Sequence, residues 1–286
     1  MATIDIECFR DEYFKVLNKV AAQGIQRSPR RLKTRDLGVT TIVVHDLTQP
    51  VLPLHTGRKI GKAVAALEAL QIIGGVSTPE PLLKVAPQFA NYMEPGVDGQ
   101  PAYFHGAYGL RVRGQLEAAI NKLREDRDTR QAVITIWDPE LDNQPGKRDY
   151  PCTVAIGLSI VDNQLNMNVL MRSNDAWLGL PNDVFVFTQL QWTIAHALEM
   201  QAGKYTHTAW SLHLYEHDLD KIDAVGPATV DAPQPLGLVC ESFMGARALA
   251  VTLLNGHDIY TNSLKNEEGY EWIEWYVKAI APAFVE

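Results

Sequence analysis

The chain has 286 residues, of which 46% are hydrophobic and 21% are charged, and its formal net charge at pH 7 is −8. This composition, without a break along the chain, is typical of a globular protein with a sizeable core, in one large domain or two ordinary ones. The negative charge argues against a general binder of nucleic acids or anionic membranes, so an anionic ligand would have to meet a local cluster of arginines.

The cysteines and the first residues indicate the compartment. The three cysteines, Cys8, Cys152 and Cys240, are odd in number, far apart and without the spacing of metal ligands, which argues against a disulfide framework. The starting sequence "MATIDIECFRDEYF" has no basic segment followed by an apolar one, and no apolar run of membrane-spanning length follows it. We therefore expect a cytoplasmic protein with no membrane partner.

Hydrophobic periodicity predicts a mixture of helices and strands. Apolar residues at three- and four-residue steps predict helices over residues 6–20, 58–73, 114–126 and 183–200. Alternating or β-branched segments predict strands over residues 131–137, 152–160, 165–173 and 204–215. The sequence "VDNQ" separates two of these strands and predicts a hairpin turn centred on Asp162 and Asn163. Helices segregated around a largely antiparallel sheet give an α+β fold.

A polar stretch, "MRSNDAWLGLPNDVFVF" at 171–187, interrupts the apolar pattern between the predicted hairpin and the helix after it. A structural interpretation is available for each polar residue. Asn182 or Asp183 would cap the helix, because both residue types are favoured caps. Arg172 and Ser173 would be surface residues at the end of a strand.

The other strand of the hairpin supports a chemical interpretation of the same stretch. It opens with "YPCT" at 150–153, which brings Cys152 beside the polar residues. A thiol near an arginine is expected to have a lowered pKa and to act as a nucleophile. A buried, inert cysteine is the alternative.

The motifs "RDYPCT", "MRSNDAWLGLPND" and "HTAWSLHLY", in this order and spacing, resemble the thymidylate synthase family. Weaker correspondences extend the resemblance over most of the chain, namely "QGIQRSPRR", "PLHTGRK", "AYGLR" and "DTRQAVITIWDP". The C-terminal part matches poorly. The resemblance implies a single thymidylate synthase-like catalytic domain over residues 1–286, a homodimer, and 5,10-methylenetetrahydrofolate as cosubstrate.

The resemblance also implies the catalytic residues. Cys152 matches the nucleophile that adds to C6 of the pyrimidine and makes C5 able to attack the folate methylene. Glu68 matches the glutamate that relays protons through water, and its apolar helix predicts a raised pKa. An ordinary helix glutamate paired with Lys62 or an arginine is the alternative. Tyr108 matches an active-site tyrosine.

The substrate contacts follow by position from the same resemblance. Guanidinium groups suit a phosphate dianion, which is how an acidic protein can bind an acidic substrate. The matching positions are Arg30, Arg172 and Ser173 for the phosphate, Arg130 for a phosphate contact across the dimer interface, His213 and Tyr215 for a sugar hydroxyl, and Asp175 for a backbone contact to the pyrimidine.

The chain departs from the family pattern at the base-reading position, where Asp183 replaces an asparagine. An ionised carboxylate accepts a hydrogen bond from the N4 amino group of cytosine, and a protonated one can also donate to N3, whereas a carboxylate would face the O4 lone pairs of uracil. The departure therefore resembles the cytidylate hydroxymethylase branch, in which water rather than hydride completes the reaction. Thr153 for histidine and Gln131 for a second arginine are further departures, and the latter weakens the phosphate site.

The sugar and the outcome of the reaction leave alternatives open. Ala176 is small enough to leave room for a 2′-hydroxyl, or it is a filler at the end of a strand. The preference for ribose follows from the resemblance to CMP hydroxymethylases of mildiomycin-type antibiotic biosynthesis. A dCMP hydroxymethylase, a thymidylate synthase acting on dUMP and a nucleotide-binding dimer without turnover are the alternatives.

Two further residue patterns have simpler interpretations. His213 and His217 are four residues apart, but the segment is predicted to be extended and no third ligand lies at a useful spacing, so we expect no metal site. Trp137, Trp177 and Trp210 are most simply explained as core or pocket-wall residues.

Overall fold

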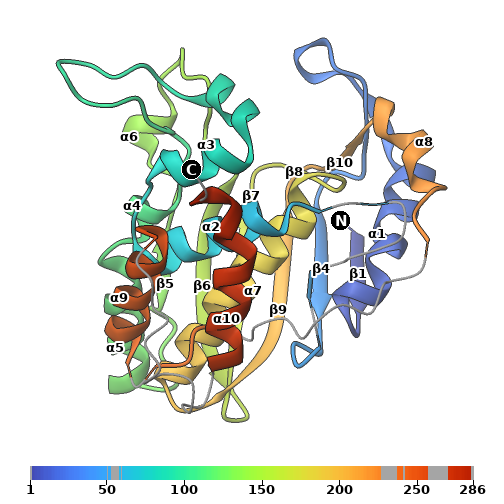
Figure 1. Cartoon of the computed structure of the whole chain (residues 1–286). Helices are drawn as coiled ribbons and strands as arrows, with labels where there is room; N and C mark the ends of the chain where they lie inside the picture. The colour runs from blue at the N-terminus through green and yellow to red at the C-terminus, as the bar shows by residue number, and fades with distance from the viewer. Residues whose placement is uncertain are drawn as a thin grey trace.

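A six-stranded sheet forms the centre of the computed structural model, which describes residues 2–49, 51–52, 58, 60–226, 237–240, 242–256 and 270–284 (Figure 1). Its strands lie in the order β1 (Ala2–Ile6), β4 (Thr40–Val44), β9 (Gln201–Ala209), β7 (Gln164–Met171), β6 (Thr153–Val161) and β5 (Val133–Thr135). The pairs β4–β9, β7–β6 and β6–β5 are antiparallel, whereas β1–β4 and β9–β7 are parallel. The sheet is therefore mixed but largely antiparallel, which agrees with the predicted α+β class.

A smaller sheet lies beside the end of the large one. Its strands lie in the order β2 (Ile25–Arg27), β3 (Thr34–Asp36), β10 (Leu212–Tyr215) and β8 (Asn174–Asp175). The predicted single strand over 204–215 is wrong in this respect, because the chain leaves the large sheet after Ala209 and enters the small one at Leu212. The backbone amide of Trp210 still donates to the carbonyl of Met171 at 2.9 Å, so both chain segments change sheets at the same place.

The predicted hairpin is confirmed as β6 and β7. Asp162 and Asn163 have φ values of 50° and 61°, the left-handed conformation that a tight hairpin turn requires and that these residue types tolerate. The pairing of the two strands shifts register between Thr153 and Ala155, next to Cys152. Such an irregularity redirects side chains at the end of a strand.

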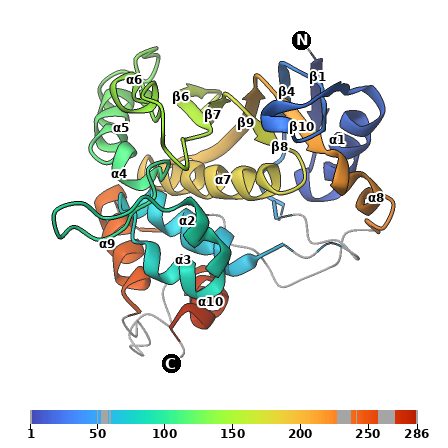
Figure 2. The same ribbon diagram turned by 90° about the horizontal axis from the view of Figure 1, so that it is seen from above.

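Two helices that are apolar on nearly all sides pack against each other beneath the large sheet (Figure 2). They are α7 (Gly179–Ala197), which also contacts β7 and β9, and α2 (Lys62–Gly74), which contacts α9 (Phe243–Leu254) and α10 (Tyr270–Ile280). Helices without a polar face are found inside a protein core. The predicted helix over 58–73 is confirmed in type, but it begins at Lys62.

The remaining helical segments surround this core. None of the described helices has the length and hydropathy needed to cross a membrane. The longer ones confirm the predictions over 6–20 and 114–126; they are α1 (Phe9–Gln23) and α5 (Gln115–Glu125). The shorter ones are η1 (Pro29–Arg31), α3 (Pro79–Val85), η2 (Pro87–Tyr92), α4 (Gly109–Val112), α6 (Pro139–Asp142), η3 (Glu216–Asp218), α8 (Leu219–Ile222) and η4 (Ala281–Ala283).

The start of α7 corrects the structural interpretation of the polar stretch. The helix begins at Gly179 after Leu178, whose side chain makes no capping bond, so Asn182 and Asp183 lie inside the helix and cap nothing. The reason is Pro181, because proline is tolerated in the first turn, where its missing N–H group would have no partner. "GLP" therefore begins the helix rather than forming a turn before it.

The tryptophans divide into two groups. Trp177 is buried and Trp137 is half-buried, as expected for core or pocket-wall residues. Trp210 is 51% exposed, so the expectation was wrong for this residue. The change of sheets between β9 and β10 turns its side chain outward.

Candidate active site

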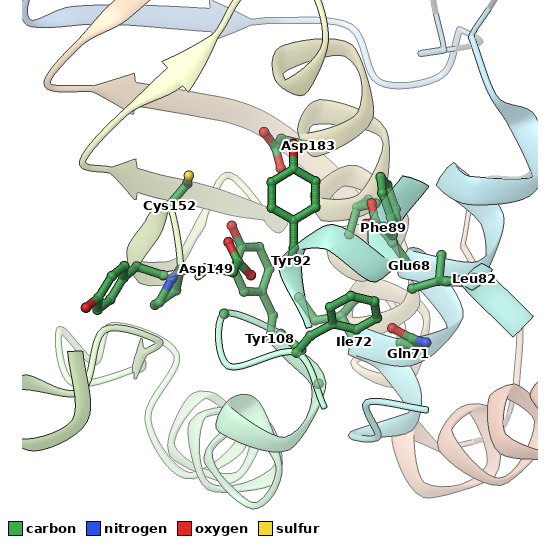
Figure 3. Close-up of a pocket in the computed structure, with 17 residues that line it drawn as sticks. Glu68, Gln71, Ile72, Leu82, Phe89, Tyr92, Tyr108, Asp149, Cys152 and Asp183 are labelled. Carbon is green, nitrogen blue, oxygen red and sulfur yellow. The ribbon is translucent and has the colours of Figure 1, made fainter. Parts of the chain in front are cut away.

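A cavity of about 250 Å³ lies between α2, α7 and the loop before β6 (Figure 3). Four residues that the sequence analysis assigned to catalysis or base reading line it, namely Glu68, Tyr108, Cys152 and Asp183. They come from α2, the N-terminus of α4, the start of β6 and the first part of α7. The fold thus brings together side chains that are up to 115 positions apart in the sequence (68 to 183).

Cys152 directly precedes β6, and Arg172 makes hydrogen bonds to the loop that carries it. The Arg172 guanidinium donates to the carbonyls of Tyr150 and Pro151 at 3.1 and 2.9 Å, and its Nη2 lies 3.7 Å from the Cys152 Sγ. Burial raises the pKa of the Cys152 thiol to about 11, although the charge of Arg172 acts to lower it. The expected lowered pKa is therefore wrong, because enclosure by protein outweighs the single nearby guanidinium.

Glu68 is surrounded by the apolar faces of α2 and α7. Its pKa is raised to about 7, mainly by burial and to a smaller extent by the charge of Asp149, while a hydrogen bond from Asn182 acts to lower it. The Asn182 Nδ2 donates to Glu68 Oε2. The predicted raised pKa is confirmed, and it argues against an ordinary ion pair, which would lower the pKa of a carboxyl group.

Asp183 faces the cavity from the α7 side and is held by one neighbour. The Asn174 Nδ2 donates to Asp183 Oδ2 at 2.6 Å. The pKa of Asp183 is raised to about 7, mainly by burial and also by the charges of Glu68 and Asp175, while the Asn174 hydrogen bond acts to lower it. Both the ionised and the neutral carboxyl are therefore populated near neutral pH.

Tyr108 connects α4 to the strand of the nucleophile. Its hydroxyl accepts a hydrogen bond from the backbone amide of Thr153 at 3.3 Å, and its ring stacks on Phe187 with centroids 6.0 Å apart. Burial raises the pKa of Tyr108 well above its usual value, so the group acts as a neutral hydroxyl. The contact fixes Tyr108 directly beside Cys152.

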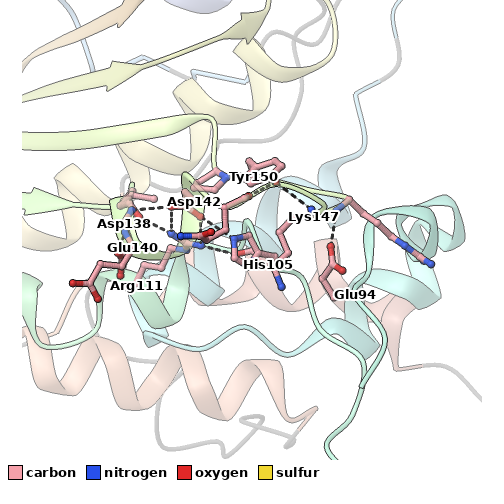
Figure 4. Close-up of polar contacts among 12 residues, drawn as sticks. Glu94, His105, Arg111, Asp138, Glu140, Asp142, Lys147 and Tyr150 are labelled. Carbon is pink, nitrogen blue, oxygen red and sulfur yellow. Dashed lines mark hydrogen bonds and ion pairs between the residues drawn. The ribbon is translucent and has the colours of Figure 1, made fainter. Parts of the chain in front are cut away.

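A polar network behind Tyr108 holds this wall of the cavity (Figure 4). Asp142 accepts from both terminal nitrogens of Arg111 at 2.6 and 2.9 Å, and its Oδ1 lies 2.8 Å from His105 Nε2. Arg111 also donates to the carbonyls of His105 and Ile136. Burial acts to raise the pKa of Asp142, but the Arg111 hydrogen bonds hold it below its usual value. The sequence carries no signal for this network, because His105 lies in the loop before α4, Arg111 in α4 and Asp142 in α6, about 30 residues further along the chain.

The residues predicted to bind the sugar and the ring lie beside the cavity, at the junction of the two sheets. His213 pairs with Asp175 across β10 and β8, and the His213 and Tyr215 rings pack edge to face at 5.3 Å. The Asp175 side chain accepts from the backbone amide of Trp177 at 2.8 Å. Ser173 is half-buried between Arg172 and β8. Arg172, Ser173, Asp175, His213 and Tyr215 are thus gathered in one region.

The two remaining phosphate contacts that the sequence predicts differ in position. Arg30 is exposed in η1, and its charge acts on the Cys152 thiol, so it lies on the side of the cavity. Arg130 is exposed in the loop before β5, and no contact within the described ranges joins it to the cavity. The adjacent Gln131 accepts from Lys122 Nζ at 3.0 Å.

Several lining residues carry no role in the sequence analysis. Asp149 packs so closely on Gly106 that an added Cβ there would lie 2.3 Å from Asp149 Oδ2, and burial raises the pKa of Asp149. Its place in "RDYPCT", three residues before the cysteine, is the only sequence signal for it. The apolar part of the lining comes from α2, α3, η2 and the loop before α4, and comprises Ile72, Leu82, Phe89, Tyr92 and Phe104.

The described ranges contain no group of three or more His, Cys, Asp or Glu side chains arranged to hold a metal ion. His213 lies in β10 and His217 in η3, so they do not share a helix face. His217 Nε2 instead lies 3.4 Å from Asp218 Oδ2.

Comparison with known proteins decides the family, since the thymidylate synthase profile matches residues 11–225. The chain belongs to the thymidylate synthase family. The match ends where the sequence resemblance becomes poor, and whether residues 1–286 form a single domain stays a prediction. Members of this family transfer a one-carbon unit from 5,10-methylenetetrahydrofolate to a pyrimidine nucleotide.

The similar curated proteins include phage enzymes. A deoxyuridylate hydroxymethyltransferase of Pseudomonas phage M6 is 31% identical over 182 residues, which are 59% of this chain and 50% of that protein. One of Bacillus phage SP01 is 26% identical over 246 residues, 77% of this chain and 63% of that protein. A putative thymidylate synthase of Methanococcoides burtonii is 28% identical over 144 residues, 48% of this chain and 64% of that protein. The chain spans about half the length of the first of these relatives.

Proposed function

We propose that the protein is a CMP 5-hydroxymethylase, which transfers a one-carbon unit from 5,10-methylenetetrahydrofolate to cytosine C5 and then adds water to give 5-hydroxymethyl-CMP. The observation that carries the proposal is Asp183, a carboxyl group at the base-reading position, in one cavity with Cys152 and Glu68. The names of the phage relatives support hydroxymethylation as the outcome. Asp183 supports cytosine as the base.

The nucleophilic step uses Cys152. Its sulfur forms a bond to C6 as the C5=C6 π bond breaks, and the thiol proton passes to water. The electron pair of that bond is delocalised over C5, C4 and N3, which makes C5 nucleophilic. A thiol with a pKa of about 11 is mostly protonated at neutral pH, so it loses its proton as it attacks. The Arg172 guanidinium, 3.7 Å from the sulfur, stabilises the developing thiolate.

The cavity lining fits the cosubstrate, which supplies the methylene carbon. Phe89, Tyr92 and Phe104 line the cavity and offer flat apolar surfaces to a planar pterin. Phe89 lies on the side of the cavity away from the thiol (Figure 3). Glu68, with a pKa of about 7, exchanges a proton readily near neutral pH and is the base for the C5 proton, through water. As that proton leaves C5, the bond between the methylene carbon and the folate nitrogen breaks, and Glu68 passes the proton to the departing tetrahydrofolate nitrogen. In the last stage the ionised Glu68 takes a proton from the water that adds to the exocyclic methylene carbon. Cys152 then leaves C6, which restores the C5=C6 bond.

The phosphate and the sugar have a matching set of side chains. Arg30, Arg172 and Ser173 supply charge and hydrogen bonds to the phosphate, and His213 and Tyr215 bind a sugar hydroxyl. The protein is a homodimer in this proposal. The exposed Arg130 of each subunit completes the phosphate site of the other subunit. Its place in the cytoplasm stays a prediction.

The preference for ribose has the weakest support. Ala176 is fully buried, and its carbonyl accepts from the Tyr13 hydroxyl at 2.7 Å, a contact that also suits a core filler. Ribose, and a role in mildiomycin-type antibiotic biosynthesis, rest on the resemblance noted in the sequence, so dCMP is an alternative substrate.

Hydroxymethylation of dUMP is a second candidate, and two observations favour it. The phage relatives are named deoxyuridylate hydroxymethyltransferases. A neutral Asp183 would also offer one donor and one acceptor to uracil, as an asparagine does. A thymidylate synthase acting on dUMP would give a methyl product instead, and a nucleotide-binding dimer without turnover would give none.

Release of tritium from C5 separates these functions. CMP, dCMP, UMP and dUMP, each labelled with tritium at C5, are incubated with and without 5,10-methylenetetrahydrofolate. The products are identified by mass. We expect folate-dependent release from CMP and a hydroxymethyl product. Release from dUMP alone would favour the second candidate, a methyl product would indicate hydride transfer, and binding without release would indicate a nucleotide-binding protein.

A further inference from the structure

A buried asparagine holds the base-reading carboxyl group from behind. Asn174, in β8, is 3% exposed, and its Nδ2 donates to Asp183 Oδ2 at 2.6 Å. Its backbone is fixed as well, because the Asn174 amide donates to the carbonyl of Ser211 at 2.9 Å. The Asn174 Oδ1 is buried without a partner among the described residues. The Asp183 contact is therefore the one that sets the orientation of this side-chain amide.

A neutral carboxyl group by itself reads a pyrimidine ambiguously. Cytosine presents a donor at position 4 and an acceptor at position 3, and uracil presents the reverse. A carboxylic acid offers one donor oxygen and one acceptor oxygen, and moving the proton between the oxygens reverses their order. An unsupported acid would therefore fit either base. Since Asp183 is partly protonated near pH 7, this ambiguity would apply to it.

We infer that Asn174 is the positioning residue that sets base specificity, because its N–H group makes Oδ2 of Asp183 a permanent acceptor. The proton, when present, is then on Oδ1, and the order of donor and acceptor along the carboxyl edge is fixed. A fixed order fits one base and opposes the other. The inference rests on the proposed function in that Asp183 reads the base, but it holds whichever base is preferred.

The packing around the pair supports this role. Gly179 covers the hydrogen bond: a Cβ at this position would lie 3.1 Å from Asn174 Nδ2 and 3.3 Å from Asp183 Oδ2. Contacts this short require one or both groups to shift by a few tenths of an ångström, which disturbs the hydrogen bond between them. The first residue of α7 thus leaves room for the bond that orients Asp183.

The test is the ratio of kcat/KM for CMP to kcat/KM for UMP, with the deoxynucleotide pair measured in the same way. Asn174→Leu keeps the approximate size of the side chain and removes the donor. We expect the ratio to move toward one by about tenfold or more, mainly because the disfavoured base is accepted. Gly179→Ala keeps the donor but crowds the bond, so a smaller change in the same direction is expected. It also provides a test if Asn174→Leu does not fold.

The matched control is Asn182→Leu, which removes the amide donor on the other carboxyl group, Glu68. We expect it to lower turnover of both bases and to leave their ratio unchanged. A ratio that Asn174→Leu leaves unchanged while thermal melting shows a folded protein would overturn the inference. If the wild-type ratio favours uracil, the proposal of a CMP enzyme fails, whereas movement of that ratio toward one would still support the role of Asn174.

Discussion

Replacement of Asp183 by asparagine tests the reading of the base most directly. The Asn174 Nδ2 donates to Asp183 Oδ2 at 2.6 Å, which fixes Oδ2 as an acceptor and leaves Oδ1 to carry the proton. Asp183→Asn is nearly isosteric and places a permanent donor and acceptor at the base edge. We expect kcat/KM to fall for CMP and to rise for UMP or dUMP.

The size of the change follows from the environment of the side chain. An unsatisfied hydrogen-bonding group in an enclosed site costs about 1–3 kcal/mol. Each base is then affected by roughly 5- to 150-fold, and the cytosine-to-uracil ratio falls by up to ~10⁴ when both effects combine. The assay is steady-state kinetics on the four nucleotides with products identified by mass. An unchanged ratio in the variant would refute the assignment of Asp183 as the base-reading residue.

A stability measurement checks the same residue without any substrate. Burial raises the pKa of Asp183 from 3.8 to about 7, so between these values the folded state holds a proton that the unfolded state has released. The contribution of this group to the free energy of unfolding therefore decreases as the pH rises from about 4 to about 7. Asp183→Asn lacks this titration. Its Tm relative to wild type should be higher at pH 8 than at pH 5.

Three further predictions follow from the site. Cys152→Ser should abolish tritium release and leave CMP binding within a few-fold, because a hydroxyl fits the space of a thiol but is a poor nucleophile at neutral pH; retained release would exclude the covalent mechanism. Mixing Arg130→Ala subunits with Cys152→Ser subunits should restore activity, since one of the two sites in the mixed dimer then has neither change. No recovery after confirmed subunit exchange would contradict a shared site. The cytosine-to-uracil ratio should rise with pH through about 7, because the Asp183 carboxylate that forms there repels uracil O4. A ratio independent of pH from 6 to 8 would mean that Asp183 does not change its charge in the complex.

Local patterns were sufficient to predict the central hairpin and the longer helices before residue 200, but not the strands β1 to β4 or the helices α9 and α10. The β6–β7 hairpin and α2 follow from turn residues and apolar runs, which act over a few neighbouring positions. The break at Trp210 could not be predicted in this way, because "KYTHTAWSLHLY" has strand-forming residues on both sides of the point where the chain changes sheets. Pairing with Met171 fixes that point, and pairing between distant segments leaves no local signal.

The candidate site was likewise predicted in part from the sequence. The family motifs predicted which side chains meet, and Cys152, Glu68, Tyr108 and Asp183 do line one cavity. The pKa of Cys152 was predicted with the wrong direction, because the sequence indicates the neighbouring arginine but not how fully protein encloses the thiol. For Glu68 the apolar residues of its own helix were enough to predict the direction, and the packing of α2 against α7 buries the carboxyl group.

The asparagines at 174 and 182 explain why the polar stretch contains two Asn-Asp pairs. Asp183 places a second carboxyl group within electrostatic reach of Glu68, and the charge of each such group makes ionisation of the other more difficult. Asn182 donates to Glu68 and Asn174 donates to Asp183, so each carboxyl group has its own amide donor, which lowers its pKa. Without these donors, both pKa values would be higher, and each carboxyl group would ionise less readily near neutral pH. A change of the base-reading residue to aspartate thus depends on the amides beside it, which is why the polar residues lie together inside an apolar core.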